Sequence, residues 1–207
     1  MSTRPQPTQA ALDKANEIIH SGDDDLVINF FAFNKNTPRH ILLFKFKLFA
    51  FKLYPRYYTS KPAPFHDDML DHMMSAYYGE IKYTNLGFRG CAKSSYTKLF
   101  LAYVILNDMD ATRKYIKVLT RNVGNAKQMV TDTYNLLVEA APLYGDVFQK
   151  EGDKKREETM GSFTTTDDRK VLAGTVGMTQ RGHLQDAYRP DFLVFDDVED
   201  RESIQSL

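Results

Sequence analysis

The feature that most constrains this chain is the pattern G-x-x-x-x-A-K-S, which occupies residues 87–94 as GFRGCAKS. A glycine-containing turn followed at once by a helix directs several backbone N–H groups at one place, and such a place attracts phosphate oxygens. The pattern departs from the usual phosphate-loop sequence at one position, because Ala92 stands where a second glycine is usual. A loop of this kind needs a strand before it and a helix after it.

The flanking residues follow that order. Residues 81–86 form a short run that ends at a glycine and predicts a strand, while residues 95–106 carry apolar side chains at helical spacing. The lysine of a phosphate loop reaches the β- and γ-phosphates and the next hydroxyl holds Mg²⁺, so these roles fall to Lys93 and Ser94. An ordinary glycine turn between a strand and a helix is the alternative.

A second motif lies further along the chain, where the apolar run Phe192–Phe195 ends in Asp196 and Asp197. A buried parallel strand has this form when it delivers acids to the carboxyl edge of a sheet. One carboxylate there can organise the Mg²⁺ shell, and a neighbour can orient or deprotonate an attacking water. A strand followed by a capping turn is the alternative.

Apolar periodicity predicts the other elements. Strand and helix alternate after residue 80, which favours an α/β fold with a parallel sheet. The expected helices cover residues 10–20, 41–54, 65–77 and 122–141, the last ending at Pro142; the expected strands cover residues 114–120 and 192–195, with a hairpin formed by residues 162–166 and 170–175.

The N-terminal region is predicted to be a separate helical part. A proline- and tyrosine-rich connector at residues 55–64 divides an N-terminal tail and helical subdomain, residues 1–63, from a core, residues 64–207. The acidic triplet at residues 23–25 is interpreted as a helix cap rather than a metal site. At the start of the next helix, His66 and Asp67 could reach an adenine edge, with helix capping by Asp67 as the alternative.

Charge and cysteine content exclude several classes of protein. The net charge of the 207 residues is +0, so any nucleic-acid contact must be local. Lysines 45, 47 and 52 interrupt an apolar run and argue against a membrane span; they predict either packing or a basic aromatic surface for DNA or lipid. The single cysteine, Cys91, excludes an internal disulfide, and the polar N-terminus does not resemble a secretion signal.

Taken in order, these stretches resemble the ATPase domain of the large terminase subunits of tailed bacteriophages. The resemblance rests on GFRGCAKS at residues 87–94, on Arg181-Gly182 and on RPDFLVFDDVE at residues 189–199, with Pro64-Phe65-His66 upstream. It implies a P-loop NTPase fold of the additional-strand, RecA-like type, with a mostly parallel sheet flanked by helices. It also implies a motor that hydrolyses ATP with Mg²⁺ to move double-stranded DNA into a procapsid.

The resemblance assigns roles to individual residues. Arg89 matches an arginine that can contact the γ-phosphate, and Arg181 is either a nucleotide contact or a structural or DNA-facing residue. The catalytic carboxylate is either Asp197 or Glu199, because the family often has Asp-Glu where this chain has Asp-Asp. The expected metal residues are Ser94 and Asp196, and the expected ATP-binding residues are Gly87, Gly90, Cys91, Ala92, Lys93, Ser94, Ser95 and His66.

The same resemblance implies partners and a location. The partners would be the portal protein, the small terminase subunit and further copies of the chain in a ring on the procapsid, in the cytoplasm of a bacterial host and without a membrane. The family continues past the second motif with a coupling segment and a nuclease domain, so we expect the fold to be C-terminally incomplete. The alternatives are a non-hydrolysing nucleotide-binding or assembly fragment, and another P-loop translocase or helicase.

Overall fold

The computed structural model describes residues 7–58, 61–83, 90–148, 161–176 and 189–197, and the chain divides into two compact units. Unit 1 consists of Met1–Thr112 and Glu139–Gly145, and unit 2 consists of Arg113–Val138 and Asp146–Leu207. The described part of unit 1 is almost entirely helical, whereas unit 2 carries the β-sheet. The predicted α/β class is therefore confirmed.

Unit 1 contains the helices expected from the apolar periodicity. Two of them begin with side-chain caps: the Thr8 hydroxyl accepts from the Ala11 N–H at 3.3 Å, and the Asp23 carboxylate accepts from the Leu26 N–H at 3.0 Å. The acidic triplet therefore caps a helix, as predicted. The elements are α1 (Gln9–Ile19), α2 (Asp24–Phe31), α3 (Arg39–Leu53), the 3₁₀ turn η1 (Pro55–Tyr57), α4 (Pro64–Tyr77) and α5 (Lys93–Asn107).

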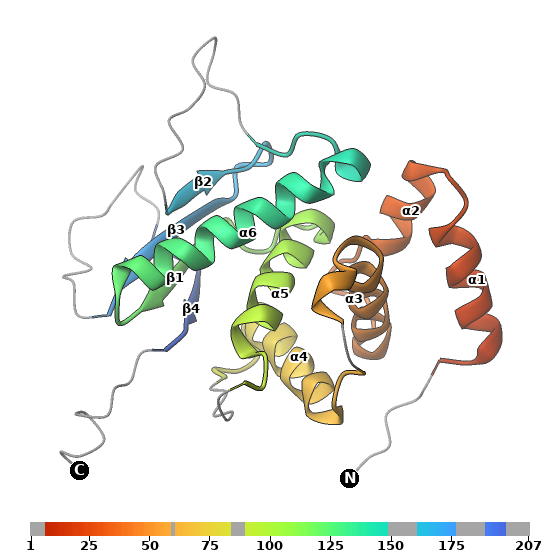
Figure 1. Ribbon diagram of the computed structural model, residues 1–207, viewed down its shortest axis with the longest axis horizontal. Coiled ribbons are helices and arrows are strands. Elements are labelled where there is room, and N and C mark those ends of the chain that lie inside the picture. The colour runs from red at the N-terminus through yellow and green to blue at the C-terminus, as the bar shows by residue number, and fades with distance from the viewer. Residues whose placement is uncertain (1–6, 59–60, 84–89, 149–160, 177–188, 198–207) are drawn as a thin grey trace. The chain divides into compact units, whose positions relative to one another are not determined.

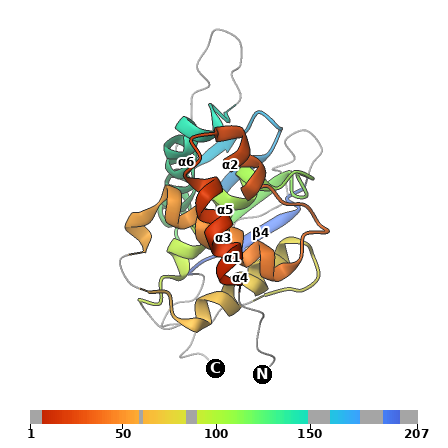
Figure 2. The ribbon, with the colours of Figure 1, turned by 90° about the vertical axis from the view of Figure 1, so that its right-hand side faces the viewer.

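An aromatic core fills unit 1 around α3, which lies centrally among these helices and contacts α2, α4 and α5 (Figures 1 and 2). The Tyr103 ring of α5 is fully buried, and its centroid lies 5.1–5.4 Å from those of Phe33, Phe46 and Phe49. Contacts of this kind add to the stabilisation from burial alone. The helix that begins at the predicted phosphate loop is thus anchored by the core of unit 1.

The three lysines of α3 bond within unit 1. Lys45 donates to the Ala32 carbonyl and Lys52 to the Ile19 carbonyl, each at 2.7 Å, so both ammonium groups satisfy carbonyls at the C-terminal ends of helices. Lys47 pairs with Asp67 of α4 at 2.7 Å. These contacts favour the packing alternative over a basic surface for DNA.

Unit 2 is built on a four-stranded sheet in the order β2-β3-β1-β4. The central strand β1 (Tyr115–Thr120) is buried along its whole length and pairs in parallel with β3 (Lys170–Thr175) and β4 (Phe192–Phe195). The strand β2 (Ser162–Thr164) pairs antiparallel with β3, which confirms the predicted hairpin and makes the sheet mixed.

The second predicted motif lies on β4, which is an edge strand among the strands that the structure describes. Its side chains are alternately half-buried and exposed, with Leu193 46% and Phe195 57% exposed. The prediction of a parallel strand is confirmed, but the prediction of burial on both faces is wrong for the described part of the chain, because an apolar run does not reveal whether both faces of a strand are covered.

Asp191 fixes the start of β4 against β1. Its carboxylate accepts from the backbone N–H groups of Lys114 and Tyr115 at 2.9 and 3.0 Å, and its own N–H donates to the Tyr115 carbonyl at 3.0 Å. The Arg113 side chain donates to the Asp191 carbonyl at 3.1 Å. One residue therefore pins the register that brings Asp196 and Asp197 to the end of the sheet.

The helix α6 (Val123–Tyr144) runs past Pro142, where the sequence predicted its end. A proline removes one donor but can be accommodated in the last turn, and the Gly145 N–H closes that turn on the Ala141 carbonyl at 2.8 Å with a φ of 73°. Within unit 2, α6 lies along the sheet (Figure 1), and the Tyr134 ring packs against Phe163 of β2 at 5.9 Å.

The expected strand at residues 81–86 is not seen at residues 81–83, which are irregular, and residues 84–86 lie outside the described residues. Unit 1 extends across residue 64, so that position does not separate the two units, and a subdomain of residues 1–63 stays a prediction. In the described part of the chain, none of the helices has the length and apolar character needed to cross a membrane.

Candidate functional site

The second half of the predicted phosphate loop is a turn with two left-handed residues. Gly90 has a φ of 87° and Ala92 a φ of 60°, and α5 begins at the next residue, Lys93. The Ala92 carbonyl accepts from the Tyr96 N–H at 2.9 Å, so the first helical bond starts from the last residue of the turn. This is the turn-to-helix junction that the G-x-x-x-x-A-K-S pattern predicts.

The conformation of Ala92 explains why glycine is usual at this position. The left-handed conformation costs a residue with a β-carbon about 1–2 kcal/mol, whereas it costs glycine almost nothing. Ala92 is the N-cap of α5 and makes no side-chain cap bond. An N-terminus without a capping side chain is suited to an external anion, since backbone N–H groups and the helix dipole both favour negative charge there.

The residues around this junction differ in exposure. Cys91, one of the expected ATP-binding residues, is buried. Lys93 and Ser95 are half-buried, whereas Ser94 is exposed in the first turn of α5. The structure thus brings together Gly90 and the five residues that follow it, while Gly87 and Arg89 lie outside the described residues.

His66 connects the start of α4 to this turn. Its Nδ1 atom lies 3.0 Å from the Ala63 backbone nitrogen, and its Nε2 atom lies 3.1 Å from the Cys91 carbonyl oxygen. The imidazole is stacked on the Tyr96 ring, with centroids 4.4 Å apart and planes 3° from parallel. An adenine contact by His66 stays a prediction, and it would compete with these bonds; Asp67 pairs with Lys47 instead of capping α4.

The carboxylates of the second motif lie at the carboxyl edge of the sheet in unit 2. The Asp196 N–H donates to the Leu119 carbonyl at 3.0 Å, and the Asp197 carbonyl accepts from the Arg121 N–H at 3.4 Å. Asp196 is half-buried, whereas Asp197 is exposed and has a φ of 49°. Non-glycine residues in this region are strained, and such strain often marks functional sites.

The remaining predicted residues are only partly placed. Glu199, Arg181 and Gly182 lie outside the described residues. Among the described residues, no cluster of three or more histidine, cysteine or acidic side chains could hold a metal ion. The two expected metal residues, Ser94 and Asp196, belong to unit 1 and unit 2 respectively, so their roles stay predictions.

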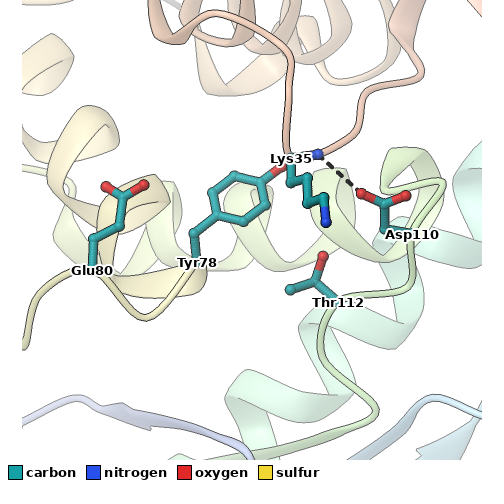
Figure 3. Close-up of a pocket in the computed structure, with 5 residues that line it drawn as sticks. All are labelled: Lys35, Tyr78, Glu80, Asp110 and Thr112. Carbon is teal, nitrogen blue, oxygen red and sulfur yellow. Dashed lines mark hydrogen bonds between the residues drawn. The ribbon is translucent and has the colours of Figure 1, made fainter.

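Unit 1 also contains a cleft of about 570 Å³ that is separate from the predicted site residues (Figure 3). Polar contacts involve its lining residues: the Lys35 backbone N–H donates to Asp110 at 3.0 Å, and Glu80 pairs with Arg39 at 2.6 Å. The cleft is lined by Lys35, Tyr78, Glu80, Asp110 and Thr112.

The sequence did not reveal how two residues position these sites. His66 was predicted to contact the nucleotide, but its bond to a carbonyl 25 residues away leaves no local pattern in the sequence. Asp191 was part of the second motif, but its bonds to the start of β1 depend on strand pairing.

Comparison of the chain with family models, curated proteins and solved structures finds no match.

Proposed function

We propose that this chain is a P-loop ATPase module that binds ATP with Mg²⁺ and hydrolyses it. The observation that carries the proposal is the junction at residues 90–93, where a turn with two left-handed residues leads into a 15-residue helix whose first residue is Lys93. Two observations support it, the residue pattern and the backbone conformation. They are independent because the loop was predicted from the pattern alone.

Each residue of the junction has a task in phosphate binding. The backbone N–H groups at the start of α5 would donate to phosphate oxygens, and the Lys93 ammonium would neutralise charge on the β- and γ-phosphates. The Ser94 hydroxyl is exposed and offers the oxygen ligand that Mg²⁺ prefers. Bound Mg²⁺ would supply further neutralisation of the developing charge.

The carboxylates after β4 would serve hydrolysis. Asp196 would bind within the metal shell, and Asp197 or Glu199 would orient or deprotonate the attacking water. This proposal is supported by the pairing of β4 with β1, which puts both aspartates at the carboxyl edge where α/β proteins bind ligands.

The resemblance to large terminase subunits extends the proposal to a motor that moves double-stranded DNA into a procapsid. Under this proposal the partners are the portal protein, the small terminase subunit and other copies of the chain. A nucleotide-binding or assembly fragment without hydrolysis is the competing function, and another P-loop translocase or helicase is a third. Phosphate release measured with and without duplex DNA separates the first two: the motor predicts stimulation by DNA, and the assembly fragment predicts binding without turnover.

Nucleotide binding itself is tested by calorimetry with Lys93→Ala, and with Lys98→Ala in the same helix as the matched control. Loss of a charge-assisted bond costs about 1.5–3 kcal/mol, so we expect Lys93→Ala to weaken ATP binding by roughly 10- to 150-fold and Lys98→Ala to leave it near the parent value. Equal ATP affinity in the parent and Lys93→Ala would contradict the phosphate-loop assignment.

A further inference from the structure

The hydrogen bonds of His66 fix the protonation of its ring. The Ala63 backbone N–H can only donate, so the Nδ1 atom that it meets at 3.0 Å must be the unprotonated nitrogen. The Cys91 carbonyl can only accept, so the Nε2 atom at 3.1 Å carries the proton and donates it. The two bonds therefore require the tautomer that carries its proton on Nε2, with a defined donor and a defined acceptor.

The acceptor side of the ring belongs to α4. His66 is the third residue of this helix, and its bond from the N-cap residue Ala63 satisfies a backbone N–H at the helix start. The next turn of α4 is held by the buried side chains of Met69 and Leu70. Stacking on Tyr96 sets the plane of the ring. The Nε2–H is thus aimed at the turn from an anchored position.

The donor side of the ring acts on a single peptide group. All peptide bonds of the described residues are trans, so the Cys91 carbonyl and the Ala92 N–H of the same planar group point in opposite directions. Because the Cys91 carbonyl points toward His66, the Ala92 N–H points away from His66. Within the described part of the chain, this N–H donates to no backbone acceptor.

We propose that His66 is a positioning residue for the phosphate site: by holding the Cys91 carbonyl, it orients the Ala92 N–H as a donor for a phosphate oxygen of the nucleotide. The proposal rests on the proposed nucleotide-binding function. The turn needs such a support because Ala92, on one side of this peptide group, and Gly90, the residue before Cys91, are both left-handed, and glycine in particular has several accessible conformations.

The test compares three variants of the full chain. His66→Gln has an amide that can accept from Ala63 and donate to Cys91, so it can restore both bonds. His66→Phe keeps an aromatic ring against Tyr96 but makes neither bond. His72→Phe is the matched control, because His72 lies on the same helix, stacks on Tyr83 at 5.0 Å and hydrogen-bonds to the Asp68 carbonyl of its own helix at 2.7 Å.

Thermal unfolding and ATP affinity are measured for each variant. The affinity is measured at a temperature well below the unfolding midpoint of the least stable variant. We expect His66→Phe to bind ATP roughly tenfold more weakly, since one bond to a charged oxygen is lost, and we expect His66→Gln and His72→Phe to stay within about twofold of the parent. A merely structural role would lower the unfolding midpoint of His66→Phe and leave the affinity of the folded protein unchanged, which would overturn the proposal.

The same titrations distinguish the failure of this proposal from failure of the proposed function. If the parent chain binds no ATP, the proposed function fails and the positioning role fails with it. If the parent binds ATP, Lys93→Ala binds it more weakly, and His66→Phe binds as tightly as the parent, the phosphate loop stands and only the role of His66 is wrong. Weak binding by His66→Gln as well as His66→Phe would also contradict the role, because the two bonds would then not be the cause.

Discussion

Ala92 has a backbone conformation that costs an alanine more than a glycine, and it lies at the residue before Lys93. We expect Ala92→Gly to raise the free energy of unfolding by about 0.5–1 kcal/mol, because the relief of left-handed strain exceeds the extra freedom of glycine in the unfolded chain. Urea unfolding checks this expectation.

A second left-handed alanine provides the control. Ala111 has a φ of 45° and lies away from the loop, so Ala111→Gly should stabilise unit 1 by a similar amount without changing ATP affinity. Destabilisation by Ala92→Gly would mean that the turn does not have this conformation in solution.

The catalytic carboxylate is the other question at the scale of single residues. Asp197→Asn and Glu199→Gln should both retain ATP binding, because neither side chain is assigned to the phosphates. We expect one of them to lower the rate of phosphate release by 10²-fold or more, which is the contribution expected of a general base. Steady-state phosphate release decides between them, and unchanged turnover in both variants would place the base elsewhere.

At the scale of the element, Asp191 joins two strands that are far apart in sequence. Removing its carboxylate leaves the N–H groups of Lys114 and Tyr115 without their acceptor. We expect Asp191→Ala to lower the free energy of unfolding by about 1–3 kcal/mol and to speed hydrogen exchange in β4.

The control for this prediction is Asp191→Asn, whose amide oxygen can still accept one of the two bonds. It should lie between the parent and Asp191→Ala in urea unfolding. If both variants unfold with the parent midpoint, the carboxylate does not hold β1 and β4 in register.

The helices and strands were predictable because their signals are local. The apolar spacing of α3 and α5 and the acidic cap at Asp23 depend on residues within one or two turns, and the structure agrees with them. The half-exposed face of β4 was missed because burial depends on what packs on the strand. The end of α6 was missed because Pro142 is accommodated in its last turn.

Less of the candidate site was predictable than of the fold. The pattern predicted that a helix follows the turn, and α5 begins at Lys93, two residues before the apolar spacing of residues 95–106. The left-handed conformation of Ala92 was not predicted, because alanine seldom adopts it. The link from His66 to the Cys91 carbonyl could not be predicted, because any residue type can offer a backbone carbonyl.

At the scale of the whole molecule, buried tyrosines set the alkaline limit of stability. Burial is the largest cause that raises the pKa of Tyr54, Tyr103 and Tyr144 in unit 1 above the ordinary value of 10. Above pH 10 the unfolded chain loses these protons while the folded chain keeps them, so stability falls as pH rises. Below about pH 10 both states are protonated and this contribution is fully present.

We therefore expect the unfolding midpoint to fall steeply above pH 10, with each such tyrosine reducing the free energy of unfolding by about 1.4 kcal/mol per pH unit. Thermal unfolding followed by circular dichroism from pH 8 to pH 11.5 measures this effect. Tyr144→Phe removes a hydroxyl that donates to Asn107 at 2.7 Å, and it should make the alkaline slope shallower. An unchanged slope in this variant would show that Tyr144 ionises as freely in the folded chain as in the unfolded one.

The central claim is that the backbone at the start of α5 binds the phosphates of ATP. The most direct measurement is the amide chemical shift of each residue as Mg²⁺ and ATP are added to the ¹⁵N-labelled chain. We predict the largest changes at residues 90–95, reduced in Lys93→Ala. Changes concentrated instead around Lys35, Tyr78 and Asp110, or no changes at all, would contradict the account.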